Sequence, residues 1–81
     1  MLKKINEIID RWDPMGLFPF APKDEYTDES MLIEKALAKT IDARLLGEEI
    51  QRIFINSFGK EDFVKSIDEC VEIARLIIQS T

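Results

Sequence analysis

The sequence predicts an all-α protein, a compact bundle of four helices that forms one domain over residues 1–81. Apolar residues recur every three or four positions through most of the chain, as they do on one side of a helix. No segment shows the two-residue alternation, framed by hairpin turns, that is typical of paired strands. The links between the helical runs are short, which favours antiparallel neighbours. A chain of 81 residues lies near the lower size limit for a self-sufficient apolar core.

The first two helices are predicted over about residues 2–12 and 25–40. The first is amphipathic and should stop at Asp13, because Pro14 disfavours helical geometry in the residue before it and has no amide hydrogen. The second should start beside Asp24, whose carboxylate can cap free amides. Acidic residues follow in its first turn, where the helix dipole favours negative charge.

The last two helices are predicted over about residues 43–57 and 61–79. Asp42 or Thr40 can cap the third helix, and Gly59 is a typical residue just past a helix end. The fourth run is so apolar that we expect it to be central in the bundle or shared with another chain.

Two small residues fall on buried faces of these last helices. Gly47 would cost about 1 kcal/mol relative to alanine unless another segment approaches closely there, and we expect such an approach. Cys70 lies in the middle of an apolar face, without the cationic and accessible setting that a reactive thiol needs. We interpret it as a small buried hydrophobic residue.

A proline-rich, apolar stretch connects the first two helices. Asp13 to Gly16 matches a type I turn, and a proline-stiffened strip with Phe18 and Phe20 follows. Because so small a domain needs apolar filling, we expect the strip and both phenylalanine rings to pack onto the helices. The alternative is that part of the strip stays exposed and binds a partner. The sequence PFAP at residues 19–22 has the P-x-x-P spacing of polyproline recognition.

Two short motifs carry a family resemblance. WDPMG is followed, after a few residues, by DEY and a helix; the residues concerned are Trp12, Asp13, Pro14, Gly16, Asp24, Glu25 and Tyr26. Over about residues 8–37 this pattern resembles a group of small, acidic, mostly helical bacterial proteins classed as a domain of unknown function. Similar WDP and DEY motifs occur in proteins suspected to be immunity partners of bacterial toxins. The resemblance implies an all-helical fold and no established activity, and this loop carries two phenylalanines where many relatives are more polar.

The composition argues against most kinds of chemistry. The chain has no histidine and one cysteine, so the usual machinery of nucleophilic and zinc-dependent catalysis is missing. We expect neither an enzyme nor a bound cofactor or metal. A net charge of −5 disfavours nucleic acid as a partner. Charges interrupt the amino-terminal segment and no apolar run is long enough to span a bilayer, so we expect a cytoplasmic protein that does not bind membranes.

Two function hypotheses follow from the sequence. The first is a non-enzymatic protein-interaction module, immunity-like in the sense of the resemblance, whose acidic surface binds a basic partner. The second is a carboxylate-dependent metal-binding protein or small hydrolase built on acids around the loop. The candidate partner surface combines exposed acids with apolar residues that fall off the main helical faces: Glu25, Asp28, Met31, Leu45 and Ile55. Such apolar residues could also form a homodimer surface.

Overall fold

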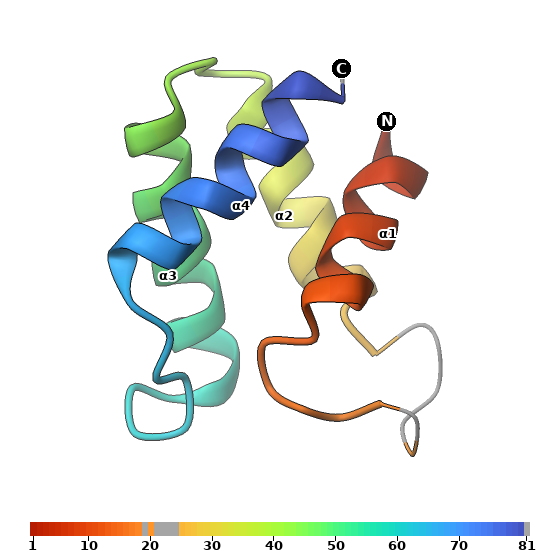
Figure 1. Cartoon of the computed structure of the whole chain (residues 1–81), viewed down its shortest axis with the longest axis vertical. Helices are drawn as coiled ribbons and strands as arrows, with labels where there is room; N and C mark the ends of the chain where they lie inside the picture. The colour runs from red at the N-terminus through yellow and green to blue at the C-terminus, as the bar shows by residue number, and fades with distance from the viewer. Residues whose placement is uncertain (19, 21–24, 81) are drawn as a thin grey trace.

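The computed structural model describes residues 1–18, 20 and 25–80. Within these residues the chain is all-α and contains no strand. The four helices are α1 (Leu2–Trp12), α2 (Thr27–Leu37), α3 (Ala43–Phe58) and α4 (Ile67–Gln79). They form the predicted four-helix bundle, in which each helix runs antiparallel to the next (Figure 1).

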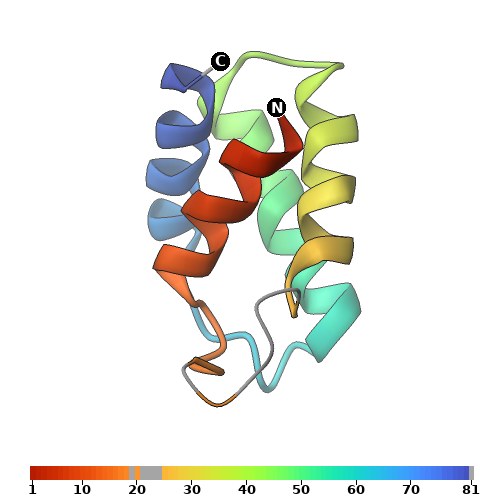
Figure 2. The same cartoon turned by 90° about the vertical axis from the view of Figure 1, so that its right-hand side faces the viewer.

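The connections divide between the two ends of the bundle. The link from α2 to α3 lies at the same end as both chain termini, and the links from α1 to α2 and from α3 to α4 lie at the opposite end (Figure 1). We call this opposite end the loop end; its described residues are 13–18, 20, 25–26 and 59–66. Viewed from the side, α1 lies in front, between α4 and α2, with α3 behind (Figure 2). No helix in the described part of the chain is long and apolar enough to cross a membrane.

The core receives side chains from all four helices and from both connections at the loop end. The sequence supplies the required helical faces, since isoleucines and aromatic residues recur at three- and four-residue spacing. The buried apolar residues are Ile5, Ile9, Tyr26, Ile33, Leu46, Ile50, Ile53, Phe54, Phe63, Cys70, Ile73, Ala74 and Ile77. Cys70 is therefore a buried free thiol, as expected, and burial together with the nearby Glu69 raises its pKa to about 11. A thiol with that pKa stays protonated and unreactive near neutrality.

Helices α3 and α4 approach each other closely at Gly47. A Cβ atom added to Gly47 would lie 2.7 Å from the Cγ2 atom of Val71 and 2.8 Å from its Cα atom. Only glycine lets the two backbones come this close, so the expected close approach is confirmed. At the start of the same helix, the Asp42 carboxylate accepts a hydrogen bond from the backbone amide of Leu45, which confirms one of the two predicted caps.

Two helix starts differ from the predicted bounds. Helix α2 spans Thr27–Leu37 rather than residues 25–40, with Tyr26 in the cap position and no side-chain cap. Asp24, the expected cap, lies outside the described residues. Helix α4 begins at Ile67 rather than residue 61, and the Ser66 hydroxyl caps it. The intervening residues form a tight turn that places Phe63 in the core.

Candidate functional site

The α1–α2 connection is shaped from the end of α1 onward by Asp13. Its φ of 46° and ψ of 61° place it in the left-handed region, and its amide donates to the carbonyl of Ile9 to close the helix. Pro14 then prevents continuation. The amide of Gly16 donates to the Asp13 carbonyl at 3.0 Å, which closes the predicted four-residue turn. Gly16 has a φ of 66°, a conformation that glycine adopts without steric cost.

The Asp13 side chain binds three other residues of the connection. Its Oδ1 atom accepts hydrogen bonds from the amide of Leu17 at 2.9 Å and from the hydroxyl of Tyr26 at 2.7 Å, and its Oδ2 atom accepts from the amide of Phe18 at 3.2 Å. The Tyr26 hydroxyl in turn accepts from the amide of Met15 at 3.1 Å. The aspartate of WDP and the tyrosine of DEY are thus the two halves of one hydrogen-bonded anchor.

The electrostatics of this anchor favour an ionised Asp13. Burial alone would raise its pKa, but the hydrogen bonds from Tyr26, Leu17, Phe18 and Gly16 outweigh burial and lower the pKa below its usual value. Burial and the bond to Asp13 raise the pKa of Tyr26, which stays a neutral donor. Burial, with a smaller contribution from the nearby Asp13 charge, raises the pKa of Asp10.

A cluster of aromatic side chains packs against Tyr26 of the anchor. The ring of Phe18 packs edge-on against Tyr26, with centroids 5.7 Å apart, and Tyr26 packs against Phe54 at 5.9 Å. Trp12 contacts Phe54 edge-on at 5.8 Å, and its indole Nε1 donates to Oε2 of Glu69 at 2.7 Å. Each aromatic residue of the two motifs therefore packs in the core while its polar atom has a hydrogen-bond partner, as buried Trp and Tyr require.

The two phenylalanines of the loop differ in burial. Phe18 is half-buried and packs against the core, as expected. Phe20 is 96% exposed, so the expectation that both rings fold inward is wrong for Phe20. The backbone contacts differ as well: Asp13 binds the amides of Leu17 and Phe18, whereas the amide of Phe20 donates to the Leu17 carbonyl. The P-x-x-P segment that includes Phe20 lies partly outside the described residues.

The acids of the loop do not form a metal centre in the part of the chain that the structure describes. No group of three or more His, Cys, Asp or Glu side chains there could hold a metal ion. Both carboxylate oxygens of Asp13 accept hydrogen bonds within the anchor. Glu25 and Asp28 are exposed. Glu29, which the helical pattern places among apolar residues, is 7% exposed, and its Oε1 atom has no hydrogen-bond partner among the described residues.

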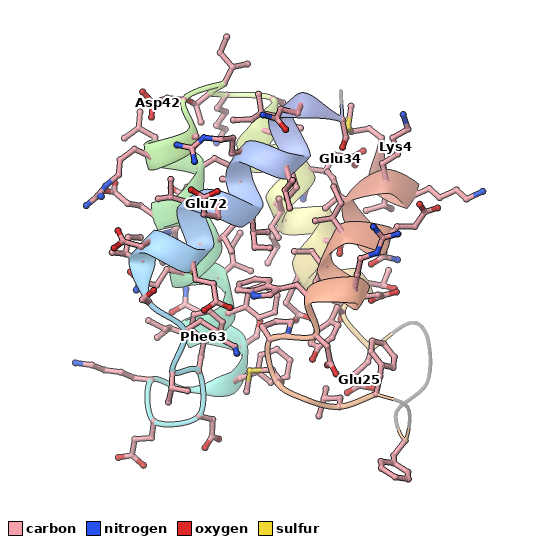
Figure 3. All side chains as sticks on the ribbon, viewed as in Figure 1. Lys4, Glu25, Glu34, Asp42, Phe63 and Glu72 are labelled. Carbon is pink, nitrogen blue, oxygen red and sulfur yellow. The ribbon has the colours of Figure 1, made fainter. Side chains whose placement is uncertain are left out.

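The five residues of the candidate partner surface come from the loop end, α2 and α3. Glu25 lies at the loop end (Figure 3), and Asp28 and Met31 are exposed on α2. Leu45, on α3, lines a groove of about 850 Å³ between α2 and α3, and Ile55 is half-buried against the core.

Leu32 lines the same groove and is 46% exposed, although it belongs to the apolar pattern of the second helix. Helical periodicity predicts a buried Leu32, because Ala36, four residues on, lies on the same side of the helix. How many residues of α2 are buried depends on how the helix packs against its neighbours. Helical periodicity does not predict this packing.

The fold and this anchor define a class of protein: a small helical bundle whose α1–α2 connection is hydrogen-bonded to it at Asp13 and Tyr26 and exposes Phe20. The chain belongs to the family described as "Domain of unknown function (DUF1871)", whose model matches residues 4–80. No curated protein and no solved structure gave a significant match to the chain.

Proposed function

We propose that the chain is a non-catalytic protein-interaction module that binds a basic protein through its loop end, with Phe20 as the aromatic contact. The observation that carries the proposal is the 96% exposure of Phe20, a few residues from amides that Asp13 and Tyr26 fasten to the bundle. Loops positioned by a rigid scaffold are common sites of binding.

Energetics favour Phe20 as a contact residue. Burying an exposed phenylalanine against a partner contributes about 1.5–3 kcal/mol. The hydrogen bonds to Leu17 and Phe18 already order the chain that leads to it, so less conformational entropy is lost on binding than with a free loop. Aromatic contacts of this kind are frequent among the few residues that dominate interface energies.

The charge around the loop end favours a basic partner. Glu25 in the α1–α2 connection and Glu61 and Asp62 in the α3–α4 connection are exposed, against the single exposed base Lys60 in the described part of this end. Val64, 78% exposed, adds a second apolar contact. Opposite charge on the partner would accelerate association and reject acidic proteins. The resemblance to proteins suspected as toxin immunity partners supports the same class of partner.

The experiment is quantitative affinity capture from the native host with three matched variants. Phe20→Ala and Glu25→Lys should lose the same basic protein. Ile41→Ala, which truncates an 81% exposed side chain at the opposite end of the bundle, should retain it. All three variants should keep the melting temperature of the wild type, because each altered side chain is exposed. Equal capture by Phe20→Ala and wild type would refute the role of the loop end.

The alternative, a carboxylate-dependent metal-binding protein or hydrolase, has one observation in its favour. The Oδ1 atom of Asp10 is buried without a hydrogen-bond partner among the described residues, and Asp10 is close enough to Asp13 for the two charges to interact. Calorimetric titration with Mg²⁺, Mn²⁺ and Ca²⁺ separates the two functions. Tight binding that Asp10→Asn abolishes would favour the metal site, and absence of heat would favour the interaction module.

A further inference from the structure

The outward face of α2 has an apolar centre between opposite charges. Met31 and Leu32 are 45% and 46% exposed, although both are large and apolar. Asp28 precedes them by about one helical turn and Lys35 follows by about one turn, and both are exposed. Residues at these spacings share one side of a helix. The face therefore reads, from its amino-terminal end, as acid, apolar pair and base.

The two charges on this face are not used within the chain. Neither Asp28 nor Lys35 takes part in a salt bridge with any of the residues that the structure describes. The exposed leucines of α3 and α4 differ, because each lies beside an ion pair of its own helix: Leu45 beside Arg44 and Glu48, and Leu76 beside Arg75 and Glu72. The face of α2 thus combines exposed apolar surface with charges that remain available to a partner.

The order of charged and apolar residues on this face is complementary to that of a second, antiparallel copy of α2. A twofold axis through the midpoint between Met31 and Leu32 would set a second α2 antiparallel to the first. Asp28 and Lys35 each lie three and a half residues from that midpoint, about 5 Å along the helix axis. Asp28 of one copy would therefore lie level with Lys35 of the other, and Met31 level with Leu32.

We propose that this face of α2 binds a second copy of the chain, forming a twofold symmetric dimer with antiparallel α2 helices. The contact is isologous, so each salt bridge and each Met31–Leu32 contact occurs twice. A parallel arrangement would instead oppose like charges, so the charge order selects the antiparallel one. The other candidate occupant, an unrelated antiparallel segment, would need the same order of acid, apolar pair and base that α2 already carries.

The dimer would relieve the small size of the bundle without using the loop end. It removes two large exposed apolar side chains per copy from water, a gain for a domain near the lower size limit. Phe20 is not among the residues of this face, so the dimer contact and the loop end are separate surfaces.

A charge-swap series tests the dimer by analytical ultracentrifugation over a range of protein concentrations. The wild type should sediment as a reversible monomer–dimer equilibrium. Asp28→Lys and Lys35→Asp should each raise the dissociation constant by at least about tenfold, since each replaces two attractions with two repulsions. The double variant Asp28→Lys with Lys35→Asp should restore the dissociation constant to within about threefold of the wild type.

Asp68→Lys, at an exposed acid on the outer side of α4, is the matched control and should leave the dissociation constant unchanged. Circular dichroism checks that every variant is folded; these side chains are exposed, so unfolding is not expected. A wild type that stays monomeric at all concentrations, or a double variant no better than its parents, would overturn the proposal. An equal effect of Asp68→Lys would overturn it as well, because net charge alone would then explain the single variants.

Discussion

The Asp13 carboxylate and the Tyr26 hydroxyl meet at 2.7 Å, although the two residues are thirteen positions apart in the sequence. This contact gives the WDP and DEY motifs a common structural role. Asp13 ends α1 and receives the amides of the loop, and Tyr26 precedes α2 and fills the core beneath it. The loop between the two helices is therefore fastened at both of its ends by one hydrogen bond.

Removing the Tyr26 hydroxyl should destabilise the protein. Tyr26→Phe keeps the ring in the core but removes one of the three donors to the Asp13 carboxylate and leaves the Met15 amide without its acceptor. We expect the free energy of unfolding to fall by about 1–3 kcal/mol, because a buried bond to a charged group is lost. Urea denaturation measures the change. Ser57→Ala, which removes an exposed hydroxyl from α3, is the control and should be neutral.

The two loop phenylalanines should differ in stability cost. Phe18→Ala removes a half-buried ring that packs edge-on against Tyr26, and we expect a loss of roughly 1–3 kcal/mol, less than a fully buried ring would cost. Phe20→Ala should change the free energy of unfolding by less than about 0.5 kcal/mol. Thermal denaturation of both variants provides the comparison. A Phe20→Ala variant as unstable as Phe18→Ala would mean that Phe20 packs against the bundle.

Asp13 should also make stability depend on pH in a defined direction. Its pKa in the folded state is below the ordinary 3.8, so its contribution is present above that pH and is lost as the pH falls through the lower folded value. Asp10 acts in the opposite direction: its raised pKa stabilises the fold in acid, and this contribution fades as the pH rises. The stability gap between wild type and Asp13→Asn should therefore be largest near neutrality and shrink below pH 3.8. Urea unfolding of both proteins over the acid range measures it, and a constant gap would contradict the assignment.

Gly47 should tolerate no side chain. An alanine Cβ would lie within 3.0 Å of both side-chain and backbone atoms of Val71, so α3 and α4 would have to separate. Overpacking of this kind costs about 1–3 kcal/mol, which equals or exceeds the gain of about 1 kcal/mol in helix propensity. Asn56→Ala, at an exposed position of the same helix, controls for propensity. A more stable Gly47→Ala protein would contradict the close approach.

Much of the fold follows from the sequence, because its signals are local. Helical periodicity predicts four helices, Asp42 predicts a cap that forms, and Gly47 on a buried face predicts a close helix contact. The start of α4 was harder to predict, because residues 61–66 are compatible with a helix until the turn at Gly59 and the Ser66 cap are both known.

The candidate site depends on relationships that one sequence does not display. The apolar composition of the loop predicted that its phenylalanines pack against the core, and this is confirmed for Phe18. The exposure of Phe20 is different, because the hydrogen bonds from the loop backbone to Asp13 end at Phe18, two residues earlier. Likewise, the exposure of Leu32 depends on the tilt of α2 rather than on its own neighbours in sequence.

The central claim is that the bond between Asp13 and Tyr26 fastens the loop, and a double-mutant cycle tests it most directly. The cycle compares the unfolding free energies of wild type, Asp13→Asn, Tyr26→Phe and the double variant. We predict a coupling energy of about 1–2 kcal/mol between the two side chains. Additive losses, with a coupling indistinguishable from zero, would contradict the claim.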